Sequence, residues 1–246
     1  AASDVYKRQD LYGNSSFSQI FFNSDSMIMG KWISGLDVLG FPFIAFNTYA
    51  HGAFGPAFYM RTHGLDEAVV GTVLGLIVAV GGVIGVIAGG ITGDRLRRRN
   101  PNGRLWVAFF AALFVIPTSL GLLYSPNLYM SLFWNFLFHI VSPMWVGLAA
   151  TTVSDLVLPR MRAIAGAFYL LVLSMIGLAL GPYTVGKISD IFQLEGHSEG
   201  DALRLAFTVA LFFLAIPLIT FVLACRYLPE DESSKIDRAR ELGEII

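Results

Sequence analysis

The residues able to do chemistry within the most apolar parts of this sequence are few, uncharged and regularly spaced. Asn47 and His51 are four residues apart, so they share one face of a helix. A second series has spacings of four, four and three residues and forms a polar stripe: Ser131, Asn135, His139 and Ser142. Unpaired polar groups on an apolar helix are costly, so these faces should point into a bundle or a wet cavity.

We therefore predict a cavity for a small solute, lined by Asn47, His51, Asn135, His139 and Ser142. Histidine titrates near neutrality, so either histidine could also bind an anion or relay a proton. The alternative is that each histidine only hydrogen-bonds to a neighbouring helix. Both interpretations stay open at the level of sequence.

A second candidate site follows a glycine-rich stretch. Asp94 comes four residues after Gly90 and stands directly before a basic cluster: Arg95, Arg97, Arg98 and Arg99. An acid here can pair with a basic group or a helix N-terminus on a neighbour and so hold one conformation. A topology signal alone would explain the arginines but not the acid. We predict a conformational gate formed by Gly90, Asp94, Arg95, Arg98 and Arg99.

The elements that must position these residues follow from the distribution of charge. The 246 residues are 55% apolar and 14% charged, against roughly 25% charged in a soluble domain. Six stretches carry no charge at all: 38–60, 68–93, 105–124, 128–154, 163–186 and 205–225. Each reaches the ~20 residues that cross a bilayer. The sequence thus predicts an all-α membrane protein with six transmembrane helices, and excludes soluble enzymes and disordered regulators.

Basic residues between these stretches predict the orientation. Eleven fall on one side, in segments 94–104 and 155–162 and after 225, and three on the other, Arg61, Lys187 and Arg204. By the positive-inside rule the richer side is cytoplasmic. We expect a multi-pass protein of the cell membrane (the inner membrane in a Gram-negative bacterium) with both ends inside. The expected organisation is a polar N-terminal segment 1–35, a bundle 36–228 and a cytoplasmic tail 229–246.

Small residues predict how the helices pack. One face of the second helix carries no side chains, because glycines recur every four residues at Gly81, Gly85, Gly89 and Gly93. The fifth helix repeats this spacing with Gly177 and Gly181. Such faces let backbones approach closely, for static packing or for sliding during a conformational cycle. Asn-x3-His occurs in the first and fourth helices, and Gly-x3-Asp at the ends of the second and fifth. This pairing predicts two inverted three-helix repeats.

A family resemblance rests on the loop after the second helix. Gly90-x3-Asp94-Arg95-x-x-Arg98-Arg99 resembles the signature loop of the major facilitator superfamily, with Arg97 where a glycine is usual. Segments 57–65 and 162–190 are similar to spinster-type members. The resemblance covers about 36–228 and implies helices seven to twelve, the C-terminal half of a twelve-helix transporter. It also implies a missing N-terminal half as partner, and a central cavity lined by the first and fourth helices.

The resulting functional prediction is secondary active transport of a small organic solute by alternating access. A channel or pore-forming subunit that assembles as an oligomer is the alternative, although no filter loop or Arg-rich voltage helix is present. No catalytic motif occurs in any span, so we do not expect an enzyme. We also expect no cofactor and no metal, since Cys225 is the single cysteine, and no nucleic-acid partner, since the net charge is −1. The expected partners are the lipid bilayer and the solute.

Overall fold

The computed structural model describes residues 34–156 and 162–225, and within these ranges the chain forms helices joined by short turns, without strands. The predicted segments 1–35 and 229–246 lie outside the described residues, apart from Ser34 and Gly35 at the start of the first helix. The bounds of these predicted segments stay a prediction.

Six long helical segments contain the six charge-free stretches. The first three are α3 (Ser34–His63), α4 (Glu67–Arg97) and α5 (Gly103–Tyr124). The fourth comprises α6 (Leu128–Val141), the 3-10 turn η1 (Ser142–Met144) and α7 (Trp145–Leu156). The fifth comprises α8 (Arg162–Leu173), the π-helical η3 (Ser174–Leu180) and α9 (Gly181–Leu194). The sixth comprises α10 (Glu199–Ala210) and the 3-10 turn η4 (Leu211–Leu214), and continues as helix to Cys225.

Five of these segments are long and apolar enough to cross a membrane; α3 is not among them. With 30 residues α3 exceeds the length required, but polar residues, among them Asn47, Thr48 and His51, interrupt its apolar sequence. The all-helical membrane fold is confirmed, and the weakest of the six predicted spans is the one that carries the first candidate polar pair.

Local chemistry explains where several helices begin and end. The side chains of Asp66, Asn127 and Ser198 accept hydrogen bonds from backbone N–H groups in the first turns of α4, α6 and α10, which is the usual role of an N-cap residue. Gly64 and Gly196 follow α3 and α9 with positive φ angles of 65° and 93°, a conformation in which glycine commonly ends a helix. These caps lie at the end of the bundle opposite the basic cluster.

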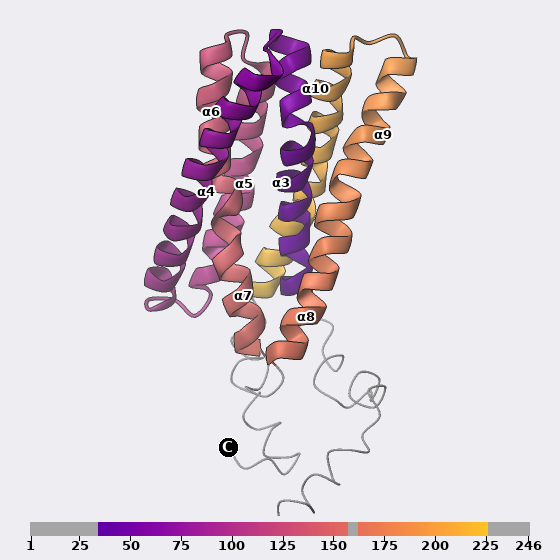
Figure 1. The fold of residues 1–246 in the computed structure, drawn as a ribbon. Helices are drawn as coiled ribbons and strands as arrows, with labels where there is room; N and C mark the ends of the chain where they lie inside the picture. Colours follow the sequence, from indigo (N-terminus) through magenta and orange to yellow (C-terminus); the bar gives the residue numbers. More distant parts are fainter. Residues whose placement is uncertain (1–33, 157–161, 226–246) are drawn as a thin grey trace, which may run out of the picture.

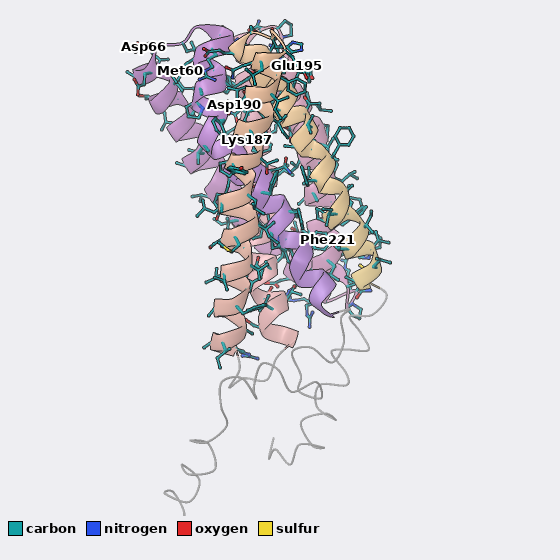
Figure 2. The ribbon with its side chains drawn as sticks, turned by 90° about the vertical axis from the view of Figure 1, so that its right-hand side faces the viewer. Met60, Asp66, Lys187, Asp190, Glu195 and Phe221 are labelled. Carbon is teal, nitrogen blue, oxygen red and sulfur yellow. The ribbon has the colours of Figure 1, made fainter. Side chains whose placement is uncertain are left out.

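Helix α3 lies in the middle of the bundle (Figure 1), where it contacts α4, α7, α8, α9 and α10. Helices α4, α5 and α6 lie on one side of it and α9 and α10 on the other. In the view turned by 90° (Figure 2), Met60, Asp66 and Glu195 lie near one end of the bundle and Phe221 toward the other. The helix that carries Asn47 and His51 is thus surrounded by neighbours.

The bundle has an aromatic interior and an apolar exterior. Phe41, Phe58, Phe138, Phe207 and Phe221 are almost completely buried. One long face of α4 exposes large apolar side chains: Leu76, Val80, Val83, Ile84, Ile87 and Ile91. A contiguous apolar surface of this kind marks contact with a membrane or with another protein.

The glycine ladder forms the contact between α4 and the fourth segment. Gly81, Gly85, Gly89 and Gly93 are all buried, and a Cβ at these positions would meet, in order, His139, Ile140, Met144 and Leu148. In the fifth segment, a Cβ on Gly177 or Gly181 would meet residues of α3. The predicted close packing along both glycine faces is confirmed.

Candidate substrate cavity and candidate gate

A cavity of about 340 Å³ lies between α3, α4 and α6, with Leu122 of α5 and Phe207 of α10 completing its wall. Three of the predicted cavity residues line it: His51, Asn135 and His139. The rest of the wall is mostly apolar or glycine: Gly52, Gly55, Pro56, Phe58, Val70, Gly71, Leu74, Gly75, Val78 and Ala79. The cavity therefore combines a large apolar surface with a few polar groups.

His51 is held by contacts with its own helix and with three neighbouring ones. Its Nδ1 lies 2.9 Å from the carbonyl oxygen of Asn47; because a carbonyl only accepts, Nδ1 carries the proton. Nε2 lies 3.0 Å from Oγ of Ser119 on α5, and it accepts a hydrogen bond from this hydroxyl. The ring also stacks between Phe138 and Phe207, with centroid distances of 4.4 and 4.3 Å. Both ring nitrogens of His51 are thus already engaged by the protein.

His139 is arranged differently. Its Nδ1 lies 3.0 Å from the carbonyl oxygen of Asn135 and must donate to it. Nε2 is then the acceptor nitrogen of the neutral ring, and no described residue hydrogen-bonds to it. The side chain is half-buried and lines the cavity. His139 therefore keeps one hydrogen-bonding position available for a solute.

Tyr59 and Ser131 join three helices beside the cavity. The Tyr59 hydroxyl donates to the carbonyl oxygen of Ser131 at 3.2 Å. The Ser131 hydroxyl lies 2.6 Å from the carbonyl oxygen of Leu122 and 3.0 Å from the Tyr59 oxygen. The side chain of Asn135, which is 5% exposed, lies close to the Tyr59 hydroxyl. This network connects α3, α5 and α6, and fixes the polar side of the cavity.

Asn47 and Ser142 lie outside the cavity lining. Asn47 is completely buried; its Nδ2 lies 3.5 Å from the carbonyl oxygen of Phe43, and its Oδ1 has no partner among the described residues. The Ser142 hydroxyl lies 2.5 Å from Oγ1 of Thr48 and so connects η1 to α3. Of the five predicted cavity residues, these two contact neighbouring protein atoms instead of the open space.

The predicted gate residues lie at the turn between α4 and α5. Oδ1 of Asp94 lies 3.0 Å from a terminal nitrogen of Arg104, the second residue of α5. The Asp94 side chain is 62% exposed and that of Arg104 only 16%. Gly90 has open space beside it, and the side chains of Arg95, Arg98 and Arg99 are exposed. The acid thus pairs with a basic residue of the next helix and keeps a solvent-accessible side.

Two further contacts hold this turn. The Cα of Gly103 packs against the backbone of Leu96 and Arg97, where a Cβ would collide. The side-chain amide of Asn102 donates to the carbonyl oxygen of Cys225 at 2.5 Å, which connects the turn to the end of the sixth segment.

Three residues of these networks were not predicted from sequence: Tyr59, Ser119 and Arg104. Ser119 follows Thr118 as one of only two hydroxyl residues in the middle of an apolar helix, and Arg104 is the first charge after the turn. These are usable signals for the residue, but neither identifies the partner on the other helix.

Replacing Ser119 by alanine should destabilise the protein by about 1–3 kcal/mol, because Nε2 of His51 would remain buried without a donor. The expected readout is a lower thermal unfolding midpoint in detergent. Thr118→Ala is the matched control: Thr118 is also buried, but its hydroxyl donates only to carbonyls of its own helix. Equal midpoints for the two variants would contradict the role given to Ser119.

Comparison with known proteins gives consistent matches. The sequence profile of the Major Facilitator Superfamily matches residues 38–243. An "MFS-type efflux pump" of Mycolicibacterium smegmatis is 31% identical over 170 residues, which are 68% of this chain and 39% of the pump. "Protein spinster homolog 3" of Danio rerio is 28% identical over 225 residues, 80% of this chain and 43% of that protein.

Solved structures agree on the fold. A crystal structure of a bacterial homologue of the human lysosomal transporter spinster, inward-facing and unoccupied, has a TM-score of 0.75 at 24% identity. The match covers 89% of this chain and 52% of the chain of that homologue. The occupied form of that protein has a TM-score of 0.68. The chain thus spans about half, or less, of the length of these relatives.

Proposed function

Because the chain belongs to the major facilitator superfamily and is similar to spinster homologues, we propose that it forms the C-terminal six-helix half of a secondary transporter. In this proposal the transporter moves a small organic solute by alternating access, with two bundles rocking about a central site. The missing partner is an N-terminal half. The share of the relatives that the chain covers, 39–52%, supports a half-transporter.

The observation that carries the proposal is the cavity between α3, α4 and α6 with its few uncharged polar groups. Buried polar groups within a membrane bundle are costly and typically functional. We assign solute contact to Asn135 and His139, and we assign to His51 the role of holding the shape of the wall, since both of its nitrogens are engaged. Asn47 and Ser142 then support the cavity from behind.

We further propose that the protein resides in the cell membrane with both ends in the cytoplasm. The basic turn after α4, the start of α8 at Arg162 and the end of the sixth segment lie at one end of the bundle (Figure 1). Within the part of the chain that the structure describes, most basic residues lie at this end, as expected for the cytoplasmic side. The gate at Asp94 then faces the cytoplasm.

Uptake by the full-length protein in proteoliposomes tests the assignment. A panel of small solutes identifies a transported one, and Asn135→Ala and His139→Ala should each lower its uptake by about tenfold or more, as expected when a binding group in a water-poor site is removed. His197→Ala, an exposed histidine outside the cavity, should leave uptake unchanged. Wild-type uptake in both cavity variants would remove these residues from the site.

A further inference from the structure

The cavity wall carries no formal charge. Among the described residues that line it there is no Asp, Glu, Lys or Arg. A charged group that left water for this wall would lose its hydration without an opposite charge to replace it, which is strongly unfavourable. This side of the cavity therefore offers no opposite charge to an ion, and the part of a solute that contacts it should be neutral.

The polar groups of the wall are mostly used up within the protein. The Tyr59 hydroxyl donates to Ser131, and both nitrogens of His51 are engaged. Two polar groups of the wall remain for a solute: the side-chain amide of Asn135, which can donate and accept, and Nε2 of His139, which only accepts because the Nδ1 proton is committed to the backbone carbonyl of Asn135. A lone pair of this kind recognises an N–H or O–H group, not another acceptor.

The opposite wall fits a flat apolar body. It is formed by α4, where Gly71 and Gly75 have nothing within 4 Å of a Cβ position and Val70, Leu74 and Val78 supply apolar contacts. Gly52 and Gly55 of α3 are likewise open. Bare backbone surfaces let a planar ring approach closely, and a volume of about 340 Å³ is within the usual range of small-molecule sites, ~300–1,000 Å³.

The geometry points to a neutral, planar, largely apolar solute with one hydrogen-bond donor, which it directs to Nε2 of His139. This inference rests on the proposed function and deepens it by giving the chemical class of the solute. It depends on the difference between the two histidines: His139 accepts a hydrogen bond from the solute, whereas His51 forms no hydrogen bond with it.

Indole and three analogues test this class in the full-length protein reconstituted into nanodiscs. Indole has a neutral ring and one N–H donor, and 1-methylindole has the same ring without the donor. Tryptamine carries an ammonium group and indole-3-acetate a carboxylate. Equilibrium dialysis with radiolabelled probes should give saturable indole binding, with 1-methylindole about three- to tenfold weaker, the usual value of one hydrogen bond. The two charged probes should bind more weakly than indole.

Two variants test whether indole binds in this cavity and whether Nε2 of His139 accepts its hydrogen bond. His139→Phe keeps an aromatic ring but removes the acceptor, so indole and 1-methylindole should bind it equally. Gly75→Leu should fill the cavity and abolish binding of both probes, whereas Gly82→Leu, on the same helix but outside the cavity and also next to open space, should not.

The outcomes separate this inference from the proposed function. No indole binding by the wild type, a preference for indole that persists in His139→Phe, or equal binding of the charged probes would overturn the solute class. If one of these results is obtained but Gly75→Leu still blocks solute uptake, only the solute class is wrong, and the proposed transport through this cavity stands. If Gly75→Leu changes neither binding nor uptake, the space is filled by the other half or by lipid, and both proposals fail.

Discussion

Alanine at Gly85 or Gly89 is expected to destabilise the bundle by about 2–3 kcal/mol or more and to abolish transport. A Cβ at Gly85 would collide with the carbonyl oxygen of Ile140 and the ring of Pro143, and a Cβ at Gly89 with the backbone of Met144. Backbone atoms cannot rotate away as a flexible side chain can, so α4 would have to move from the fourth segment. Overpacking of this kind typically costs ~1–3 kcal/mol and sometimes more.

Gly82→Ala is the matched control, because Gly82 lies on the same helix with nothing within 4 Å of its Cβ position. Alanine is the better helix former by about 1 kcal/mol, so this variant should be as stable as the wild type or slightly more stable. The thermal unfolding midpoint of each variant is measured from the folded fraction that size-exclusion chromatography detects after heating. If Gly85→Ala unfolds at the same temperature as Gly82→Ala, the close approach of α4 to η1 is wrong.

The helices and their packing faces could be predicted because both depend on local sequence. A stretch without charge, such as 68–93, crosses a membrane by length alone. Glycines four residues apart share a helix face whatever the partner is, so the ladder from Gly81 to Gly93 was recognisable before its contacts with α6, η1 and α7 were known. The same regularity showed that Asn135 and His139 share one face.

The pairings between helices could not be predicted in this way. Spacing shows which face a residue is on, but not how far along the bundle its neighbour stands. Ser142 continues the polar stripe, yet it bonds to Thr48 outside the cavity. His51 and His139 have the same local pattern, and contacts from other helices distinguish them: Ser119 of α5 and Phe207 of α10 contact the ring of His51. The two inverted repeats stay a prediction.

Helix irregularity was only partly readable from sequence. Proline lacks a backbone donor and clashes with the preceding turn, so Pro143 and Pro182 are candidates for interruptions, but the same signal occurs inside regular helix at Pro42, Pro56 and Pro117. The structure has the 3-10 turn η1 at Pro143 and the π-helical η3 just before Pro182. Which kind of interruption forms depends on packing: a Cβ at Gly177 of η3 would meet Ala45 and Tyr49 of α3, a contact that no local pattern specifies.

The second large effect is expected at the proposed gate. Asp94→Asn should lower uptake by about tenfold or more while shifting the thermal unfolding midpoint little. An exposed ion pair such as Asp94–Arg104 contributes less than ~1 kcal/mol to stability. An interaction made in only one conformation of a transport cycle has a larger effect on function, typically 5–150-fold, which corresponds to a coupling free energy of roughly 1–3 kcal/mol. Asp66→Asn, an exposed cap at the opposite end of α4 that asparagine also caps well, is the control.

The charge swap Asp94→Arg with Arg104→Asp then distinguishes a gate from a local support. It rebuilds an ion pair between α4 and α5, so the turn should keep its stability. It also presents a cation where the exposed side of Asp94 presents an anion to the rest of the transporter. If Asp94 acts on the other half of the transporter, uptake stays as low as in Asp94→Asn. Recovery of uptake in the swap would show that the acid serves only to hold the turn between α4 and α5, because a reversed charge could not reproduce a contact with an unchanged partner.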